Sequence, residues 1–155
     1  MKNKVAVALA TWFGCGYFPV GPGTAGSLAA VGIAVLLERW LGLQAYWFGI
    51  LAILLVLPGI WASTVAANLS GRKDPGMVVV DEVIGQWITL SGATVLNWKS
   101  LAAAFVLFRA LDIWKPAPAR HLESLPGGTG IVMDDVMAGI YGALVLFAAG
   151  CFNLY

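Results

Sequence analysis

Residues 127–142 read GGTGIVMDDVMAGIYG, and they place two adjacent carboxylates, Asp134 and Asp135, directly before a long apolar run. The whole chain has only 8 acidic residues among 155. Adjacent carboxylates repel each other, and burial disfavours their charge, so such a pair is costly unless a cation binds it. The segment therefore predicts an apolar helix with a cation site at its edge.

A second stretch of the chain has the same form. VVVDEV at 78–83 matches IVMDDV at 131–136, because each has three apolar residues, an acidic pair and then valine. The pair in the second stretch is Asp81 and Glu82, and again an apolar segment with small residues at helical spacing follows. We expect the two pairs to face each other and to hold metal. The alternative for either pair alone is a helix N-terminus, whose dipole favours negative charge.

The composition predicts an all-α, multi-pass helical membrane protein with a single domain over residues 1–155. Hydrophobic residues make up 60% of the chain and charged residues 11%, whereas an ordinary soluble domain carries about 25% charged residues. Long, nearly uncharged runs are typical of membrane spans. The net charge of +1 and the lack of a basic stripe give no indication of nucleic-acid binding. No obligate protein partner is evident.

Apolar runs and turn residues divide the chain into helices and loops. Residues 1–18 are interpreted as a retained segment that lies on the membrane interface or re-enters it, because its apolar part is short for a span. Helices are predicted over 28–37, 46–66, 83–96, 101–114 and 136–155. Glu38 and Arg39 are expected to interrupt the first of them, and Pro58 and Gly59 are expected to kink the second. Loops are predicted over 18–27, where Thr24 or Ser27 caps the next helix, over 68–76, and from Pro116 to near Gly130.

The distribution of basic residues predicts which ends of the helices face the cytoplasm. If Met1 is cytoplasmic, that side receives Lys2, Lys4, Arg72, Lys73, Arg109, Lys115 and Arg120, and the far side receives only Arg39 and Lys99. This is the positive-inside bias of membrane proteins. The same assignment brings both acidic pairs to one face, so we expect a metal site at the cytoplasmic ends of the helices.

Three further charged residues, Arg109, Asp112 and Lys115, are spaced i, i+3, i+6 and fall near one helical stripe. One interpretation is a cationic clamp for phosphate together with another metal ligand. The alternative is an ion pair within the helix between Arg109 and Asp112, with Lys115 reaching toward lipid headgroups. Nearby, the loop GPGTAGS at 21–27 resembles an anion-binding loop before a helix, and Gly127, Gly128 and Gly130 form either a second such loop or a flexible approach to Asp134.

The absence of certain residues excludes several types of catalytic mechanism. His121 is the only histidine, Gly21 stands where a Cys-x5-Arg phosphatase loop starting at Cys15 would need arginine, and no Gly-x-Ser-x-Gly motif is present. Carboxylates suit Mg²⁺, which takes oxygen ligands and shares its site with substrate phosphate. Metal-activated water attacking phosphorus is the reaction that remains.

Three blocks resemble, in order, the phosphatidylglycerophosphatase A family: FPVGPGTAGSLAA, VVVDEVIGQWITL and FRALDIWKPAPARHLESLPGGTGIVMDDVMAGIY. The resemblance covers nearly the whole chain. It implies an all-helical, Mg²⁺-dependent lipid phosphatase of the bacterial inner membrane. Such an enzyme converts phosphatidylglycerophosphate, an anionic phospholipid, to phosphatidylglycerol and phosphate.

The resemblance also suggests roles for the matching positions. We expect metal at Asp81, Glu82, Asp112, Asp134 and Asp135, and phosphate at Thr24, Ser27, Arg109 and Lys115. Lys115 and the two acidic pairs are the expected catalytic residues, and one carboxylate orients or deprotonates the attacking water. The rival interpretations are a small divalent-cation channel or transporter, whose intramembrane acids line an ion path, and a non-catalytic lipid-binding protein.

Overall fold

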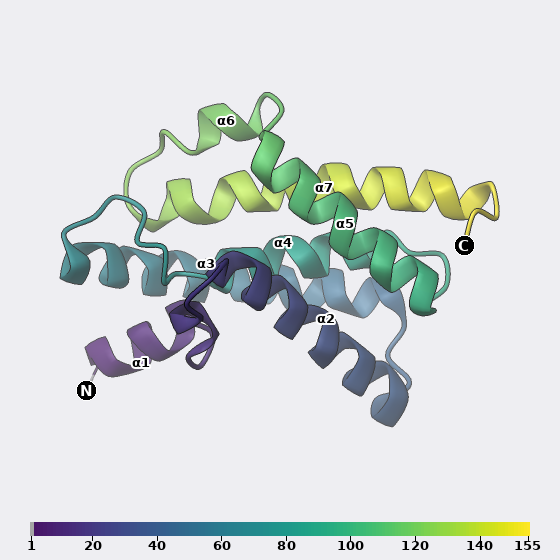
Figure 1. Ribbon diagram of the computed structural model, residues 1–155, viewed down its shortest axis with the longest axis horizontal. Coiled ribbons are helices and arrows are strands. Elements are labelled where there is room, and N and C mark those ends of the chain that lie inside the picture. Colours follow the sequence, from purple (N-terminus) through teal and green to yellow (C-terminus); the bar gives the residue numbers. More distant parts are fainter. Residues whose placement is uncertain (1) are drawn as a thin grey trace.

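The computed structural model describes residues 2–155, and over these residues the fold is all-α, as the sequence predicts (Figure 1). Met1, which the topology prediction places in the cytoplasm, lies outside the described residues. Within 2–155 there are seven α-helices and one short 3₁₀ helix, η1. Their bounds are α1 Lys2–Ala10, η1 Cys15–Tyr17, α2 Pro22–Leu41, α3 Ala45–Ser70, α4 Val80–Ser91, α5 Trp98–Trp114, α6 Ala119–Leu122 and α7 Gly128–Cys151.

Three of the described helices, α2, α3 and α7, are long and apolar enough to cross a membrane. At 1.5 Å per residue, the 26 residues of α3 and the 24 of α7 extend over about 36–39 Å, more than the roughly 30 Å of a bilayer core. The 12 residues of α4 extend over only about 18 Å. The multi-pass expectation therefore corresponds to three candidate spans, with α4 held among them.

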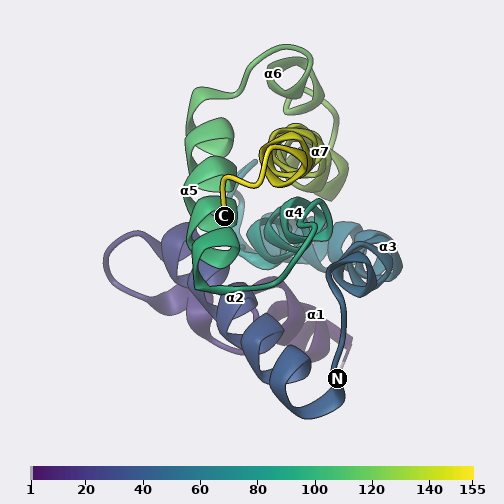
Figure 2. The ribbon, with the colours of Figure 1, turned by 90° about the vertical axis from the view of Figure 1, so that its right-hand side faces the viewer.

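The shortest of the main helices, α4, lies at the centre of the bundle. Figure 2 shows it surrounded by α2, α3, α5 and α7, and it packs against all four. Its closest neighbour is α7: a Cβ added to Gly139 would lie 2.6 Å from the carbonyl oxygen of Gly85. The hydroxyl of Thr89 donates to the carbonyl oxygens of Gly85 (3.0 Å) and Gly139 (3.3 Å). Small residues at such a contact let two backbones approach closely.

The sequence placed the start and end of α2 wrongly. The helix begins at Pro22, after Gly21 in the left-handed region (φ 64°), and no side chain caps it. Proline suits the first helical position because its missing N–H would have no partner there. The prediction that Thr24 or Ser27 caps the helix is therefore wrong, and Ser27 instead donates to the carbonyl oxygen of Gly23 (3.0 Å). The helix also continues through Glu38 and Arg39 to Leu41.

Among the other helices, α3, α5 and α7 begin earlier than predicted, α3 also ends later, α7 ends at Cys151 rather than at Tyr155, and α4 both starts and stops earlier. The capping box of Asn97 and Ser100 starts α5 at Trp98 rather than Leu101, and α3 continues through Pro58. The loop predicted from Pro116 to near Gly130 contains α6, and α7 begins at Gly128 rather than at Val136. Both acidic pairs consequently lie inside helices, in the first turn of α4 and in the second turn of α7.

The direction of each helix decides which loops meet. At one end of the bundle, a common cavity touches the starts of α2, α4 and α7, the end of α5 and the turn after α3. The opposite end gathers the α2–α3 connection, the residues after α4 and the last turns of α7. We call these the site end and the far end. Arg39 and Lys99 belong to helix termini at the far end.

Candidate active site

A cavity of about 280 Å³ opens at the site end. Seven of the charged residues that the sequence singles out line it: Asp81, Glu82, Arg109, Asp112, Lys115, Asp134 and Asp135. They come from α4, from the last turns and C-cap of α5, and from α7. Residues far apart in the sequence thus form one polar chamber at the end of three apolar spans.

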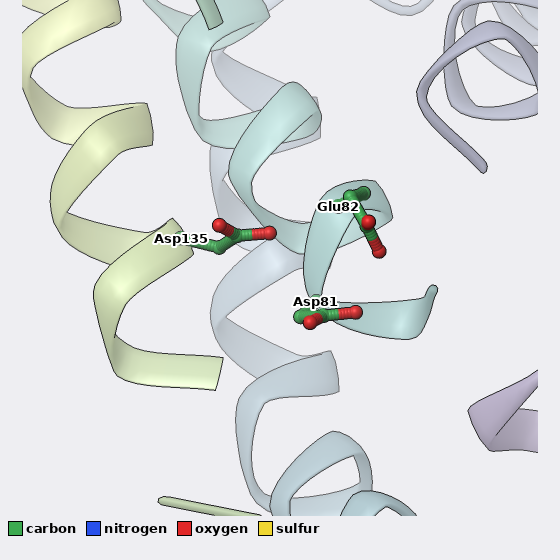
Figure 3. A group of neighbouring side chains, drawn as sticks. All are labelled: Asp81, Glu82 and Asp135. Carbon is green, nitrogen blue, oxygen red and sulfur yellow. The ribbon is translucent and has the colours of Figure 1, made fainter. Parts of the chain in front are cut away.

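Within the chamber, Asp81, Glu82 and Asp135 form a cluster, because each offers a carboxylate oxygen within 4.8 Å of the other two. Figure 3 shows Asp135 extending from α7 toward the two residues on α4. Glu82 Oε2 and Asp81 Oδ1 are buried and have no hydrogen-bond partner among the described residues. An uncompensated buried carboxylate costs several kcal/mol. A hard cation that takes oxygen ligands would remove this cost, so the three residues fit a divalent metal site.

The pKa values of the α4 carboxyls respond to this crowding. Burial, followed by the charges of Glu82 and Asp135, raises the pKa of Asp81 well above its ordinary range. Burial also raises the pKa of Glu82 to about 7, although a hydrogen bond with the Asp81 side chain and the positive charge of Arg109 both act to lower it. Without a cation, the folded protein therefore favours partly protonated carboxyls here, so protons and metal compete for the same oxygens.

The other two predicted metal ligands are ion-paired in this structure. Arg109 Nη1 donates to Asp112 Oδ2 at 2.6 Å, one helical turn away, and lies 3.9 Å from Glu82 Oε1. Lys115 Nζ donates to Asp134 Oδ2 at 2.7 Å. The ion pair between Arg109 and Asp112, which the sequence left as an alternative, is thus present, whereas Lys115 turns inward rather than toward lipid headgroups.

Lys115 is held between two acidic groups. Besides Asp134, its Nζ lies 3.3 Å from Glu123 Oε2 in the segment after α6. Partial burial by itself would lower the pKa of Lys115, but the hydrogen bond and charge of Asp134, reinforced by Glu123, raise it above its ordinary value. The ammonium group therefore remains charged and available to a phosphate that displaces these carboxylates.

The start of α2 closes one side of the chamber. Gly21, Pro22 and Gly23 line the cavity, and a side chain at Gly23 would collide with the carboxylate of Glu82 and crowd Arg109. Thr24 and Ser27, the predicted phosphate ligands of this motif, are not among the residues that line the cavity. Thr24 is exposed and Ser27 is buried, so the residues of the motif that face the chamber are Gly21, Pro22 and Gly23 rather than these two hydroxyls.

Sequence reasoning missed three charged residues of the chamber. Lys73 and Asp74 line it from the turn after α3, and Glu123 lines it from beyond α6. Both segments were interpreted as loops without a chemical role. The available signal was the charged run RKD at 72–74, three residues before the acidic stretch at 78–83.

Comparison with known proteins identifies the family of this chain. The model of the family described as Phosphatidylglycerophosphatase A matches residues 8–150. The chain belongs to the phosphatidylglycerophosphatase A family. This membership confirms the predicted family and the prediction of a membrane phosphatase of phospholipid metabolism, and it disfavours the channel and scaffold interpretations.

Individual relatives cover most of the chain. The phosphatidylglycerophosphatase A of Escherichia coli (strain K12) is 41% identical over 143 residues, which are 92% of this chain and 81% of that protein. The protein of the same name from Haemophilus influenzae is 41% identical over 141 residues, 90% of this chain and 85% of its own. A Bacteroides thetaiotaomicron protein named "Putative phosphatidylinositol-3-phosphatase" is 40% identical over 147 residues, 92% of both chains. Comparison with solved structures gives no match.

Proposed function

We propose that this chain hydrolyses the terminal phosphate of phosphatidylglycerophosphate in the chamber at the site end, with Mg²⁺ bound by Asp81, Glu82 and Asp135. The observation that carries the proposal is one cavity, at the end of three candidate spans, that is lined by a cluster of three carboxylates and by three cationic side chains, Lys73, Arg109 and Lys115. The candidate spans suit a lipid substrate, and the carboxylates suit a divalent cation. The cationic side chains suit a substrate phosphate that also binds the metal ion.

The reaction breaks the bond between phosphorus and the glycerol oxygen, joins phosphorus to the oxygen of water, and returns a proton to the glycerol oxygen. A bound divalent cation would supply charge neutralisation at the phosphate and a lowered pKa for water. Arg109 and Lys115 hold the phosphate oxygens by charge-assisted hydrogen bonds. The amides at the start of α2 donate further hydrogen bonds to the same group. One of the carboxylates orients the attacking water or takes its proton.

Asp112 and Asp134 stay predictions as additional metal ligands. In this structure each neutralises the cation that would bind phosphate. When a phosphate binds Arg109 and Lys115 in their place, Asp112 and Asp134 lose their ion-pair partners and can bind a metal ion or water. Thr24 and Ser27 likewise stay predictions as phosphate ligands.

The chamber is proposed to face the cytoplasm of a bacterial inner membrane. Lys4 lines the same hollow as Leu69, in the last turn of α3, so the basic start of the chain belongs to the site end. The turn after α3 adds Arg72 and Lys73 there, whereas the far end has Arg39 and Lys99. Positive residues concentrate in the cytoplasmic loops of membrane proteins.

Metal removal tests the proposed function. Purified protein in mixed micelles with phosphatidylglycerophosphate is expected to release phosphate with Mg²⁺, to stop in excess EDTA, and to recover when Mg²⁺ is restored. Mg²⁺ should also raise the melting temperature without substrate, because a ligand that binds only the folded state stabilises it. Phosphate release that persists in EDTA would exclude the metal-dependent reaction.

Lys115→Ala is expected to lower kcat/KM for phosphatidylglycerophosphate about tenfold or more, because it removes a charge-assisted hydrogen bond worth roughly 1.5–3 kcal/mol. Arg120→Ala is the control: Arg120 is an exposed cation in α6, outside the chamber lining. A cation that only attracts the anionic membrane contributes about 1 kcal/mol, and salt screens it. If both variants lose the same amount of kcat/KM and high salt abolishes both losses, Lys115 does not bind the substrate phosphate.

A further inference from the structure

A second hollow adjoins the chamber. It has a volume of about 340 Å³ and is lined by Ala67, Asn68, Gly71, Arg72, Lys73 and Gly127. Lys73 and Gly127 also line the chamber itself. The hollow therefore borders the chamber around the end of α3, and the two share a wall formed by Lys73 and Gly127.

The charge of this side hollow is opposite to that of the acidic cluster. Its lining contains two cations and an amide but no carboxylate. Neither Arg72 nor Lys73 makes an ion pair with any residue in 2–155. In the chamber, by contrast, Arg109 and Lys115 are both paired with carboxylates. The unpaired positive charge is thus concentrated at the side hollow and at its border with the chamber, which suits an anion.

The turn that carries Arg72 has a defined shape. Gly71 ends α3 in the left-handed region (φ 67°). The backbone N–H of Arg72 donates to Ser70 Oγ at 3.3 Å, and Ser70 Oγ donates to the carbonyl oxygen of Ala67 at 3.0 Å. Opposite this turn, the N–H of Gly128 donates to Thr64 Oγ1 at 2.9 Å and joins the start of α7 to α3. Two helix ends therefore form the walls of the hollow.

In a bilayer crossed by the candidate span α3, the hollow would lie at the level of the lipid headgroups. It surrounds the end of the candidate span α3, where apolar residues give way to Asn68, Ser70 and Arg72. The polar end of a membrane span lies in the headgroup region of the bilayer. A phospholipid that enters the site from the membrane brings its phosphodiester to this level.

We propose that the side hollow binds the phosphodiester of the lipid substrate while the chamber binds the phosphomonoester that is hydrolysed. This inference rests on the proposed function, because phosphatidylglycerophosphate carries both groups, joined by one glycerol. Arg72 is the main ligand, since a guanidinium binds two oxygens of a phosphate at once. Lys73, at the border of hollow and chamber, lies between the two phosphates. The hollow thereby selects lipids in which a headgroup separates the reacting phosphate from the diester.

The test compares two lipids with identical acyl chains. Phosphatidylglycerophosphate has a phosphomonoester and a phosphodiester, whereas phosphatidic acid has only the phosphomonoester. Arg72→Gln is expected to lower kcat/KM for phosphatidylglycerophosphate about tenfold or more, the loss that one charge-assisted contact gives. Its kcat/KM for phosphatidic acid should stay within about twofold of wild type. Arg120→Gln, which removes an exposed cation at the same end, should change neither value.

Binding of the product provides a readout that does not depend on turnover. Phosphatidylglycerol keeps the diester and lacks the monoester, so Arg72→Gln should weaken its binding about tenfold and Arg120→Gln should not. Equal losses on both lipids, or losses that high salt abolishes, would make Arg72 a general membrane-attracting charge and overturn the subsite. Weakened product binding without any hydrolysis by the wild-type protein would support the subsite and count against the proposed function instead.

Discussion

Asp135→Asn is expected to lower phosphate release by roughly a hundredfold or more and to abolish the rise in melting temperature that Mg²⁺ gives the wild-type protein. Asp135 is the member of the acidic cluster that α7 contributes. The amide keeps the size of the side chain but removes the charge that a hard cation needs. Glu82→Gln should have the same effect from the α4 side of the cluster.

The melting temperature in EDTA separates loss of metal from loss of fold. Without metal, the cluster brings three buried carboxylates together, so removing one of them should leave the protein at least as stable as wild type. The matched control is Glu38→Gln, which makes the same substitution as Glu82→Gln at an exposed residue of the far end. This variant should retain activity and the response to Mg²⁺. If Asp135→Asn keeps near wild-type turnover at limiting Mg²⁺, Asp135 is not a ligand.

Gly85→Leu is expected to abolish phosphate release and to lower stability by several kcal/mol, although Gly85 carries no functional group. A Cβ at this position would lie 2.7 Å from the carbonyl oxygen of Asp135 and would overlap the ring of Phe108. Overpacking a close-packed core typically costs 1–3 kcal/mol, and here it must also push backbone away from backbone. Because α4 and α7 carry the two sides of the acidic cluster, separating them should also abolish the melting-temperature response to Mg²⁺.

The matched control for Gly85→Leu is Gly32→Leu. Gly32 lies within the candidate span α2, is exposed, and has open space where a Cβ would be. This variant should fold, bind Mg²⁺ and release phosphate as the wild type does. A Gly85→Leu protein that still binds Mg²⁺ and turns over substrate would show that the close contact of α4 with α7 does not position the site.

Local sequence was sufficient to identify most of the chemical groups. The matched stretches at 78–83 and 131–136 indicated a shared cation site, because two acidic pairs in so apolar a chain need a common explanation. The cluster indeed takes residues from both stretches. The stripe of Arg109, Asp112 and Lys115 also leads to the same cavity. Charge and spacing are properties of the chain itself, so no fold was needed to notice them.

Helix ends were harder to predict, because their signals depend on backbone geometry. The motif before α2 contains Thr24 and Ser27, two good capping residues, yet Gly21 and Pro22 start the helix earlier. The interruption expected at Glu38 and Arg39 did not occur, since charged residues fit the exposed last turn of a helix. The prolines after α5 suggested one long loop, although α6 forms between them and α7.

The sequence by itself indicated a helical membrane protein, the family to which it belongs, and most of the charged residues that line the chamber. Only the tertiary structure decided how those residues divide: Asp135 joins Asp81 and Glu82, whereas the adjacent Asp134 pairs with Lys115. Successive residues on a helix point about 100° apart, so two neighbouring carboxylates must face different partners. Which partners they meet depends on how closely α7 approaches α4 and α5. Gly85 on α4 and Gly139 on α7 allow the close approach of these two helices.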